Sequence, residues 1–281
     1  MRVAIFLGSM LLGVSWLLPG HYFPWLTFQQ EFVALVGATF IVSAAWLSRG
    51  QRVQWPWLAL GSLLAAGVPL IQFAVGQIRF RSDMLVSSGY LAALGISVAA
   101  GATLARRRGV EMIGVMLTML SIAAAVSTGM ALMEWQNVGI GLWVEAVRPG
   151  GRLTANFSQP NHFATALAIG IMGLLLAFER RQVGKVSAVA GVAFLGFGLV
   201  MSQSRTGWLF AVILSLWLLW MRKRASLRTT PVAIVGGLLL FGLAVVSWTW
   251  LNEPIFLSHP LAKAVKPRFG LGAQANIRST M

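Results

Sequence analysis

Nine long apolar stretches account for most of this 281-residue chain. A transmembrane helix needs ~20 predominantly apolar residues to cross a ~30 Å hydrocarbon core. In lipid, backbone groups find partners only within a helix or a closed barrel. We therefore predict an all-α, polytopic transmembrane helical bundle of about nine spans, formed by residues 1–251. The stretches cover approximately residues 3–19, 32–48, 57–75, 84–104, 110–133, 160–178, 186–202, 206–221 and 231–251.

The composition excludes several classes of protein. Only 10% of residues are charged, 57% are hydrophobic and the mean hydropathy is +0.77, whereas a soluble domain carries about 25% charged residues. The net charge of +15 comes from short basic clusters between apolar stretches, so we expect no nucleic-acid partner. The absence of cysteine excludes disulfides and thiolate metal sites. Because the acidic residues are few and scattered, we expect no divalent-cation site. We also expect no cofactor.

The loops divide the basic residues unequally between two sides. If nine helices alternate in direction, thirteen basic loop residues lie on one side and five on the other. Since basic loops stay in the cytoplasm, we predict a cytoplasmic N-terminus and a short outer tail at residues 252–281. The thirteen are Arg2, Arg49, Arg52, Arg106, Arg107, Arg108, Arg180, Arg181, Lys185, Arg222, Lys223, Arg224 and Arg228, and the five are Arg79, Arg81, Arg148, Arg152 and Arg205.

The first outer loop combines aromatic residues with two ionisable side chains, His21 and Glu31. Aromatic rings gather at membrane–water interfaces, and an acidic residue stabilises the positive N-terminus of a helix. One interpretation is interfacial anchoring, with Glu31 capping the second helix. The alternative is that His21 and Glu31 line a polar cavity open to the outer side.

The longest loop leads into a polar segment, residues 151–164, with the sequence GRLTANFSQPNHFA. Pro160 suits the first turn of a helix, which places Asn161 and His162 beside unpaired N–H groups at its positive end. Such an N-terminus is a ready anion site. Gln159, Asn161 and His162 either cap the sixth helix or bind an anionic ligand there.

A second polar turn, residues 202–208 with the sequence SQSRTGW, joins the seventh and eighth helices. Ser204 is a candidate N-cap, and Arg205 begins the eighth helix. An Arg costs roughly 2.5–3.5 kcal/mol at the centre of a membrane helix, and its planar fork can bind two phosphate oxygens. Arg205 therefore either snorkels to the interface or, together with Arg152, binds a polyanion.

The two motifs, with HY at 21–22 and PWLTF at 24–28, resemble the O-antigen ligase and O-oligosaccharyltransferase superfamily, specifically pilin-type protein glycosylation ligases. The resemblance extends over all nine predicted helices. It implies a glycosyltransferase of the bacterial inner (cytoplasmic) membrane that works at the periplasmic face. Such enzymes move an oligosaccharide from undecaprenyl pyrophosphate to a Ser or Thr hydroxyl of a pilin-like protein. Other members transfer it to lipid A core or to a growing polysaccharide.

The resemblance also suggests roles for the polar residues. The arginines would hold the pyrophosphate, and the polar residues of the first motif would orient phosphate or the first sugar. The candidate substrate-binding residues are Arg152, Asn156, Gln159, Asn161, His162, Ser204 and Arg205, with His21 and Glu31 as secondary candidates.

No catalytic residue is assigned by this resemblance. A general base is needed for the acceptor hydroxyl, and the family's essential His usually lies in a large periplasmic loop followed by further helices. The chain stops at Met281, so we expect a truncated chain in which residues 252–281 begin that loop. An inactive fragment is one alternative. A lipid-linked glycan transporter is another, but it should carry ionisable residues near the bilayer midplane, where these stretches have almost none.

Overall fold

A computed structural model describes residues 1–19, 28–47, 52–108, 110–136, 138, 143 and 152–251. Within these ranges the chain contains nine α-helices, one 3₁₀ turn and no strand, which confirms the prediction of an all-α bundle. His21 and the tail at 252–281 lie outside the described residues. The elements are α1 (Arg2–Leu17), α2 (Phe28–Trp46), α3 (Trp57–Ala74), α4 (Arg81–Arg108), α5 (Val110–Trp135), η1 (Ala155–Phe157), α6 (Pro160–Glu179), α7 (Lys185–Ser202), α8 (Arg205–Ala225) and α9 (Pro231–Leu251).

Six of the described helices are long and apolar enough to cross a membrane, namely α3, α4, α5, α6, α7 and α9. Helix α1 has only 16 residues. Large apolar side chains such as Leu64, Val186 and Val232 are strongly exposed. Apolar exposure on so many helices suits lipid rather than water, so the chain is a multi-pass membrane protein.

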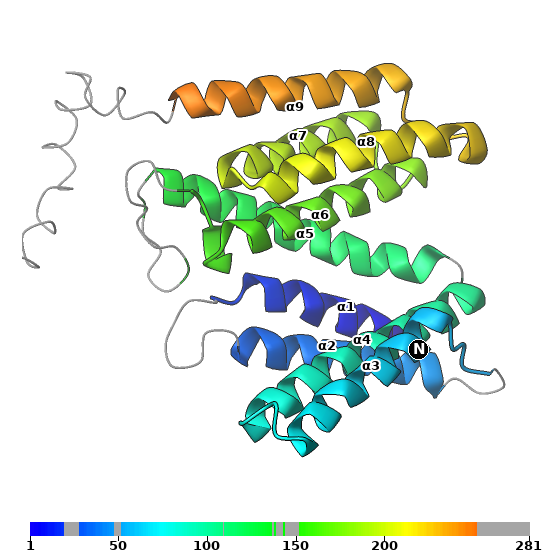
Figure 1. The fold of residues 1–281 in the computed structure, drawn as a ribbon. Helices are drawn as coiled ribbons and strands as arrows, with labels where there is room; N and C mark the ends of the chain where they lie inside the picture. Colours follow the sequence, from blue (N-terminus) through cyan, green and yellow to red (C-terminus); the bar gives the residue numbers. More distant parts are fainter. Residues whose placement is uncertain are drawn as a thin grey trace, which may run out of the picture.

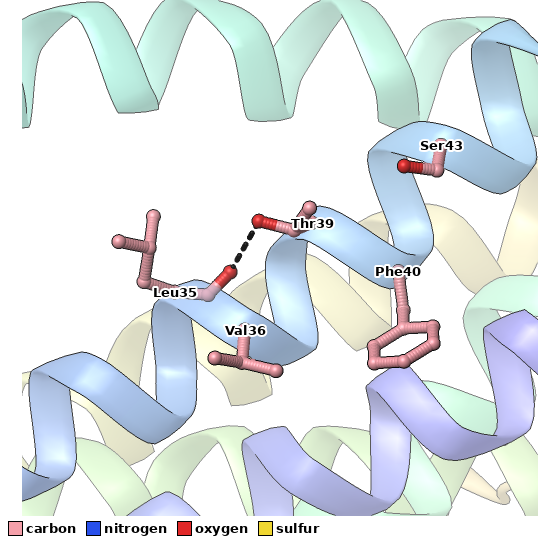
Figure 2. A pocket seen from close by; sticks show the side chains of 5 residues that line it. All are labelled: Leu35, Val36, Thr39, Phe40 and Ser43. Carbon is pink, nitrogen blue, oxygen red and sulfur yellow. Dashed lines mark hydrogen bonds between the residues drawn. The ribbon is translucent and has the colours of Figure 1, made fainter.

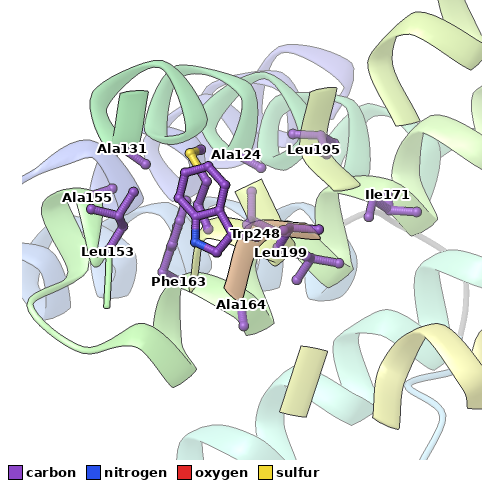
Figure 3. Close-up of a cluster of buried hydrophobic side chains, with 13 residues drawn as sticks. Ala124, Ala131, Leu153, Ala155, Phe163, Ala164, Ile171, Leu195, Leu199 and Trp248 are labelled. Carbon is purple, nitrogen blue, oxygen red and sulfur yellow. The ribbon is translucent and has the colours of Figure 1, made fainter. Parts of the chain in front are cut away.

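The helices form two groups that meet at α5 (Figure 1). Helices α1 to α4 pack against one another, while α6, α7, α8 and α9 pack on the other side of α5. Helix α5 contacts α1 and α6 and so joins the groups. The larger buried apolar cluster lies in the second group and includes Phe163, Leu199 and Trp248 (Figure 3). Leu153 and Ala155 belong to the same cluster, which ties the segment before α6 to the core.

Small residues allow α1 and α2 to approach closely. A Cβ atom added at Gly8 would lie 2.6 Å from the carbonyl oxygen of Gly37. No real side chain tolerates that distance, so the two backbones are in direct contact here, as small residues permit in membrane helices. The contact fixes α1, whose C-terminal end carries part of the site described below.

A shallow apolar hollow lies on one face of α2 (Figure 2). It is lined by Leu35, Val36, Thr39, Phe40 and Ser43. The Thr39 hydroxyl donates a 2.8 Å hydrogen bond to the carbonyl oxygen of Leu35, within the same helix. The hollow therefore presents mainly hydrocarbon, and the polar residues singled out by the sequence lie elsewhere.

Candidate functional site

The two polar motifs meet at one end of the bundle, which we call the motif end. There the N-terminus of α6, the C-terminus of α7 and the N-terminus of α8 come together. The Ser204 hydroxyl donates a 2.8 Å hydrogen bond to Oδ1 of Asn161. This bond joins the start of α8 to the first turn of α6, so the anion-attracting ends of two helices lie side by side.

The turn between α7 and α8 is built tightly around this contact. Gln203 has a left-handed backbone, with φ at 46°, which reverses the chain within two residues. The Ser202 hydroxyl bonds the carbonyl oxygen of Leu199, and the Ser204 N–H donates to the Ser202 hydroxyl at 3.3 Å. Ser202 and Ser204 are both fully buried. The predicted N-cap position of Ser204 is confirmed, but its hydroxyl bonds Asn161 rather than capping α8.

The two arginines of the motifs approach the same turn. The Arg152 Nε–H donates a 3.2 Å hydrogen bond to the carbonyl oxygen of Ser202, at the C-terminus of α7. That is the negative end of a helix, where a cation is stabilised. Arg205 is the first residue of α8 and directly follows Ser204. Both arginines are exposed, so Arg152, bonded to Ser202, and Arg205, next to Ser204 in the chain, are both accessible to a ligand near this turn.

The other predicted residues of the first motif lie at the start of α6. Pro160 occupies the first helical turn, as predicted, and Gln159 is the N-cap residue. The Gln159 side chain makes no capping hydrogen bond, so capping does not explain its presence. Gln159, Asn161 and His162 are all exposed. These three side chains are accessible to a ligand at the motif end.

Asn156 differs from its neighbours because it is fully buried. Its side-chain Nδ2 donates to the carbonyl oxygen of Trp16, near the C-terminus of α1. The carbonyls of Leu17 and Leu18 accept from the side chains of Trp143 and Gln30. Three successive carbonyls at the end of α1, which lack helical partners, are thus satisfied by side chains. In this structure Asn156 joins α1 to the 152–157 segment and is not accessible at the surface.

Glu134, near the end of α5, is a polar residue at the motif end that neither sequence motif includes. Its side chain is buried, with 4% of its surface exposed. It accepts hydrogen bonds from the N–H groups of Thr154 and Ala155 at 2.9 and 2.6 Å, and from the Thr154 hydroxyl at 3.2 Å. The sequence does contain a signal for this residue, because Glu134 is an acidic residue at the C-terminal end of an apolar stretch. A carboxylate is unfavourable at the negative end of a helix, so its presence there indicates a specific partner.

Of the two secondary candidates, only Glu31 lies within the described residues, and it belongs to α2. Glu31 lies in the first turn of α2, which fits the predicted helix cap, and its carboxylate interacts with the side chain of Tyr90 on α4. His21 lies outside the described residues, so a cavity shared by His21 and Glu31 stays a prediction. Among the described residues, no group of three or more His, Cys, Asp or Glu side chains is arranged to hold a metal ion.

These features define a multi-pass helical membrane protein with a cationic, hydrogen-bonded polar site at one end. No family model and no solved structure matches the chain. The chain is 30% identical over 216 residues to the general O-oligosaccharyltransferase of Acinetobacter baylyi, a match that covers 74% of this chain and 36% of that protein. It is 25% identical over 223 residues to the ComP-specific O-oligosaccharyltransferase of the same organism, covering 79% of this chain and 40% of that protein.

We therefore identify the chain as a homologue of O-oligosaccharyltransferases, which confirms the resemblance to that superfamily of glycosyltransferases. The chain spans well under half the length of these two relatives.

Proposed function

We propose that the chain takes part in membrane glycosyl transfer, moving an oligosaccharide from undecaprenyl pyrophosphate to a hydroxyl acceptor. The acceptor is a Ser or Thr of a pilin-like protein, and the site faces the periplasm from the bacterial inner membrane. The observation that carries the proposal is the Ser204–Asn161 hydrogen bond. It brings together both motifs of the resemblance, two helix N-termini and two exposed arginines.

The donor's pyrophosphate fits the electrostatics of the motif end. A diphosphate presents several anionic oxygens, and helix N-termini offer backbone donors and a positive partial charge. The guanidinium of Arg205 can bind two phosphate oxygens at once. Arg152 already uses its Nε–H on Ser202, which aims the side chain at the same turn. Gln159, Asn161 and His162, all exposed at the start of α6, orient phosphate or the first sugar.

The transfer step needs little covalent chemistry from these residues. The acceptor hydroxyl oxygen forms a bond to the anomeric carbon of the first sugar, and the bond from that carbon to the phosphate oxygen breaks. The polyprenyl pyrophosphate leaves with the electron pair, and the hydroxyl proton passes to a base. Arg152 and Arg205 stabilise the negative charge that develops on the departing pyrophosphate, a preorganised effect of the kind that dominates many enzymatic rate enhancements.

The name of the second relative supports transfer to one particular acceptor, because that enzyme is called ComP-specific. Lipid A core is the competing acceptor within the superfamily. A chemical difference separates the two, since a protein acceptor presents a Ser or Thr side chain within a peptide, whereas lipid A core presents a sugar hydroxyl. Acceptor choice does not change the proposed donor site at the motif end.

The donor site is tested by binding. The purified chain in lipid nanodiscs is titrated with undecaprenyl pyrophosphate bearing a short oligosaccharide, and inorganic pyrophosphate is added as competitor. We expect saturable binding of the lipid-linked glycan that pyrophosphate weakens and that Arg205→Ala weakens strongly. Binding that is absent, or that is indifferent to both pyrophosphate and Arg205, would overturn the proposal.

A further inference from the structure

Glu134 connects the end of α5 to the segment that carries Arg152. Its carboxylate accepts three hydrogen bonds from Thr154 and Ala155. Two of the three donors are backbone N–H groups of consecutive residues, so the carboxylate binds mainly the backbone of the segment. The carboxylate therefore helps to set the position of residues 152–157 relative to α5, together with Leu153 and Ala155 in the buried apolar cluster.

Burial of a carboxylate at this place is costly for the fold. Removing a charged group from water requires compensating hydrogen bonds, and a negative charge near the C-terminus of a helix is disfavoured by the helix dipole. Both costs apply to Glu134, because it is only 4% exposed and is the second-last residue of α5. Its hydrogen bonds to the 152–157 segment offset that cost, which indicates that holding this segment is the role of the side chain.

The held segment has an unfavourable backbone. Ala155 within the segment and Ser158 directly after it both have positive φ, at 52° and 59°, in the region that L-residues with a side chain rarely occupy. Such residues keep this conformation only where surrounding contacts determine it. The N–H of Ala155 is itself one of the groups that Glu134 binds. Without Glu134, Ala155 loses the hydrogen bond that helps to hold its left-handed backbone.

The segment in turn orients the proposed donor site. It begins with Arg152, whose Nε–H reaches Ser202 two residues before Ser204. Ser158 then connects it to Gln159, the N-cap residue of α6, two positions before Asn161. We propose that Glu134 is a positioning residue, whose carboxylate fixes the 152–157 segment so that Arg152 lies beside the Ser204–Asn161 contact. The proposal rests on the proposed donor site for its functional consequence, but its structural part stands without it.

The chain provides a matched control at the opposite end of the bundle. Glu179, the last residue of α6, accepts from the N–H groups of Arg228 and Thr229 and from the Thr229 hydroxyl. The same three kinds of donor therefore bind a glutamate at the end of a helix. This second cluster fixes the loop between α8 and α9, and Glu179 lies at the opposite end of α6 from the first motif. Loss of Glu179 removes a comparable set of hydrogen bonds without touching the motif end.

Two measurements test the inference on the purified chain in nanodiscs. Hydrogen–deuterium exchange reports directly on the N–H groups of Thr154 and Ala155. Titration with undecaprenyl pyrophosphate bearing a short oligosaccharide reports on the donor site. Glu134→Ala is expected to speed exchange in residues 152–157 and to weaken donor affinity by about 10- to 100-fold, the loss expected when a hydrogen bond from a charged group such as Arg152 is no longer made to the donor. Glu179→Ala is expected to speed exchange only around residues 226–230 and to leave donor affinity unchanged.

Glu134→Gln separates positioning from a chemical role of the charge. The Gln oxygen can accept both backbone N–H groups and its amide can donate to the Thr154 hydroxyl, so exchange and affinity should stay within about threefold of wild type. If Glu134→Ala does not fold, Glu134→Asp replaces it, since a side chain one methylene shorter should loosen the same segment.

Unchanged exchange in 152–157 in the Ala or Asp variant would overturn the inference whatever the donor result. Faster exchange with unaltered donor affinity would overturn the link to the site. If the wild type binds no donor while Glu134→Ala still frees the segment, the proposed function fails and the structural role of Glu134 stands.

Discussion

The Ser204 hydroxyl lies 2.8 Å from Oδ1 of Asn161, although the two residues are 43 positions apart in the chain. Ser204 is fully buried while Asn161 is exposed, so the bond runs from the packed turn to the surface of the motif end. It fixes the Asn161 carboxamide, because an oxygen that accepts from Ser204 leaves the amide nitrogen to face outward as a donor. A donor in that position suits a phosphate or a sugar oxygen.

The coupling between these residues can be measured with a double-mutant cycle. Ser204→Ala and Asn161→Ala should each weaken binding of a lipid-linked oligosaccharide, and the double variant should lose less than the sum. The expected coupling energy is about 0.5–1.5 kcal/mol, as for a neutral hydrogen bond. Additive losses would show that the two side chains act independently in donor binding.

Arg205 provides a test of phosphate recognition by geometry. Arg205→Lys keeps the positive charge but loses the planar fork, so donor affinity should fall by about tenfold or more while the protein accumulates normally in membranes. Arg224, an exposed residue at the other end of α8 that stacks on Trp220, supplies the comparison. Arg224→Lys should leave donor affinity unaltered. Equal affinities of the Arg205→Lys variant and wild type would leave Arg205 as a snorkelling anchor.

The membrane fold follows from local features of the sequence, but the site depends on packing. Apolar stretches, Pro160 in the first turn of α6 and Ser204 at the N-cap of α8 each reflect the preferences of a few neighbouring residues. The Ser204–Asn161 hydrogen bond joins residues 43 positions apart, and the bond from Thr154 to Glu134 joins residues 20 positions apart. No local pattern specifies which distant partner a polar side chain meets, since that choice follows from how helices pack.

The orientation of the bundle is tested with reporter fusions. The unequal division of basic loop residues predicts that the end of α4 lies in the cytoplasm and the 134–159 loop outside. Alkaline phosphatase, which is active only outside the cytoplasm, should be inactive when fused after Arg108 and active when fused after Gly150. A green fluorescent protein reporter should give the reverse pattern. The opposite result at both positions would invert the orientation and place the motif end in the cytoplasm.

Asn156 should behave as a structural residue, in contrast to its exposed neighbour Gln159. Its Nδ2 donates to Trp16 and no part of the side chain reaches the surface, so Asn156→Ala leaves a carbonyl at the end of α1 without that partner. Loss of a buried hydrogen bond costs about 1–3 kcal/mol, which should lower the melting temperature of the protein in detergent. Donor affinity of the folded protein should fall less than in Glu134→Ala, because Glu134 still binds Thr154 and Ala155 and the exposed residues of α6 are untouched. Gln159→Ala should weaken donor binding and leave the melting temperature unchanged, since its side chain is exposed and makes no capping bond.

Melting measured by intrinsic tryptophan fluorescence, together with donor titration of both variants, separates the two roles. An Asn156→Ala protein that melts like wild type but binds donor poorly would return Asn156 to the substrate-contacting residues that the motif first suggested.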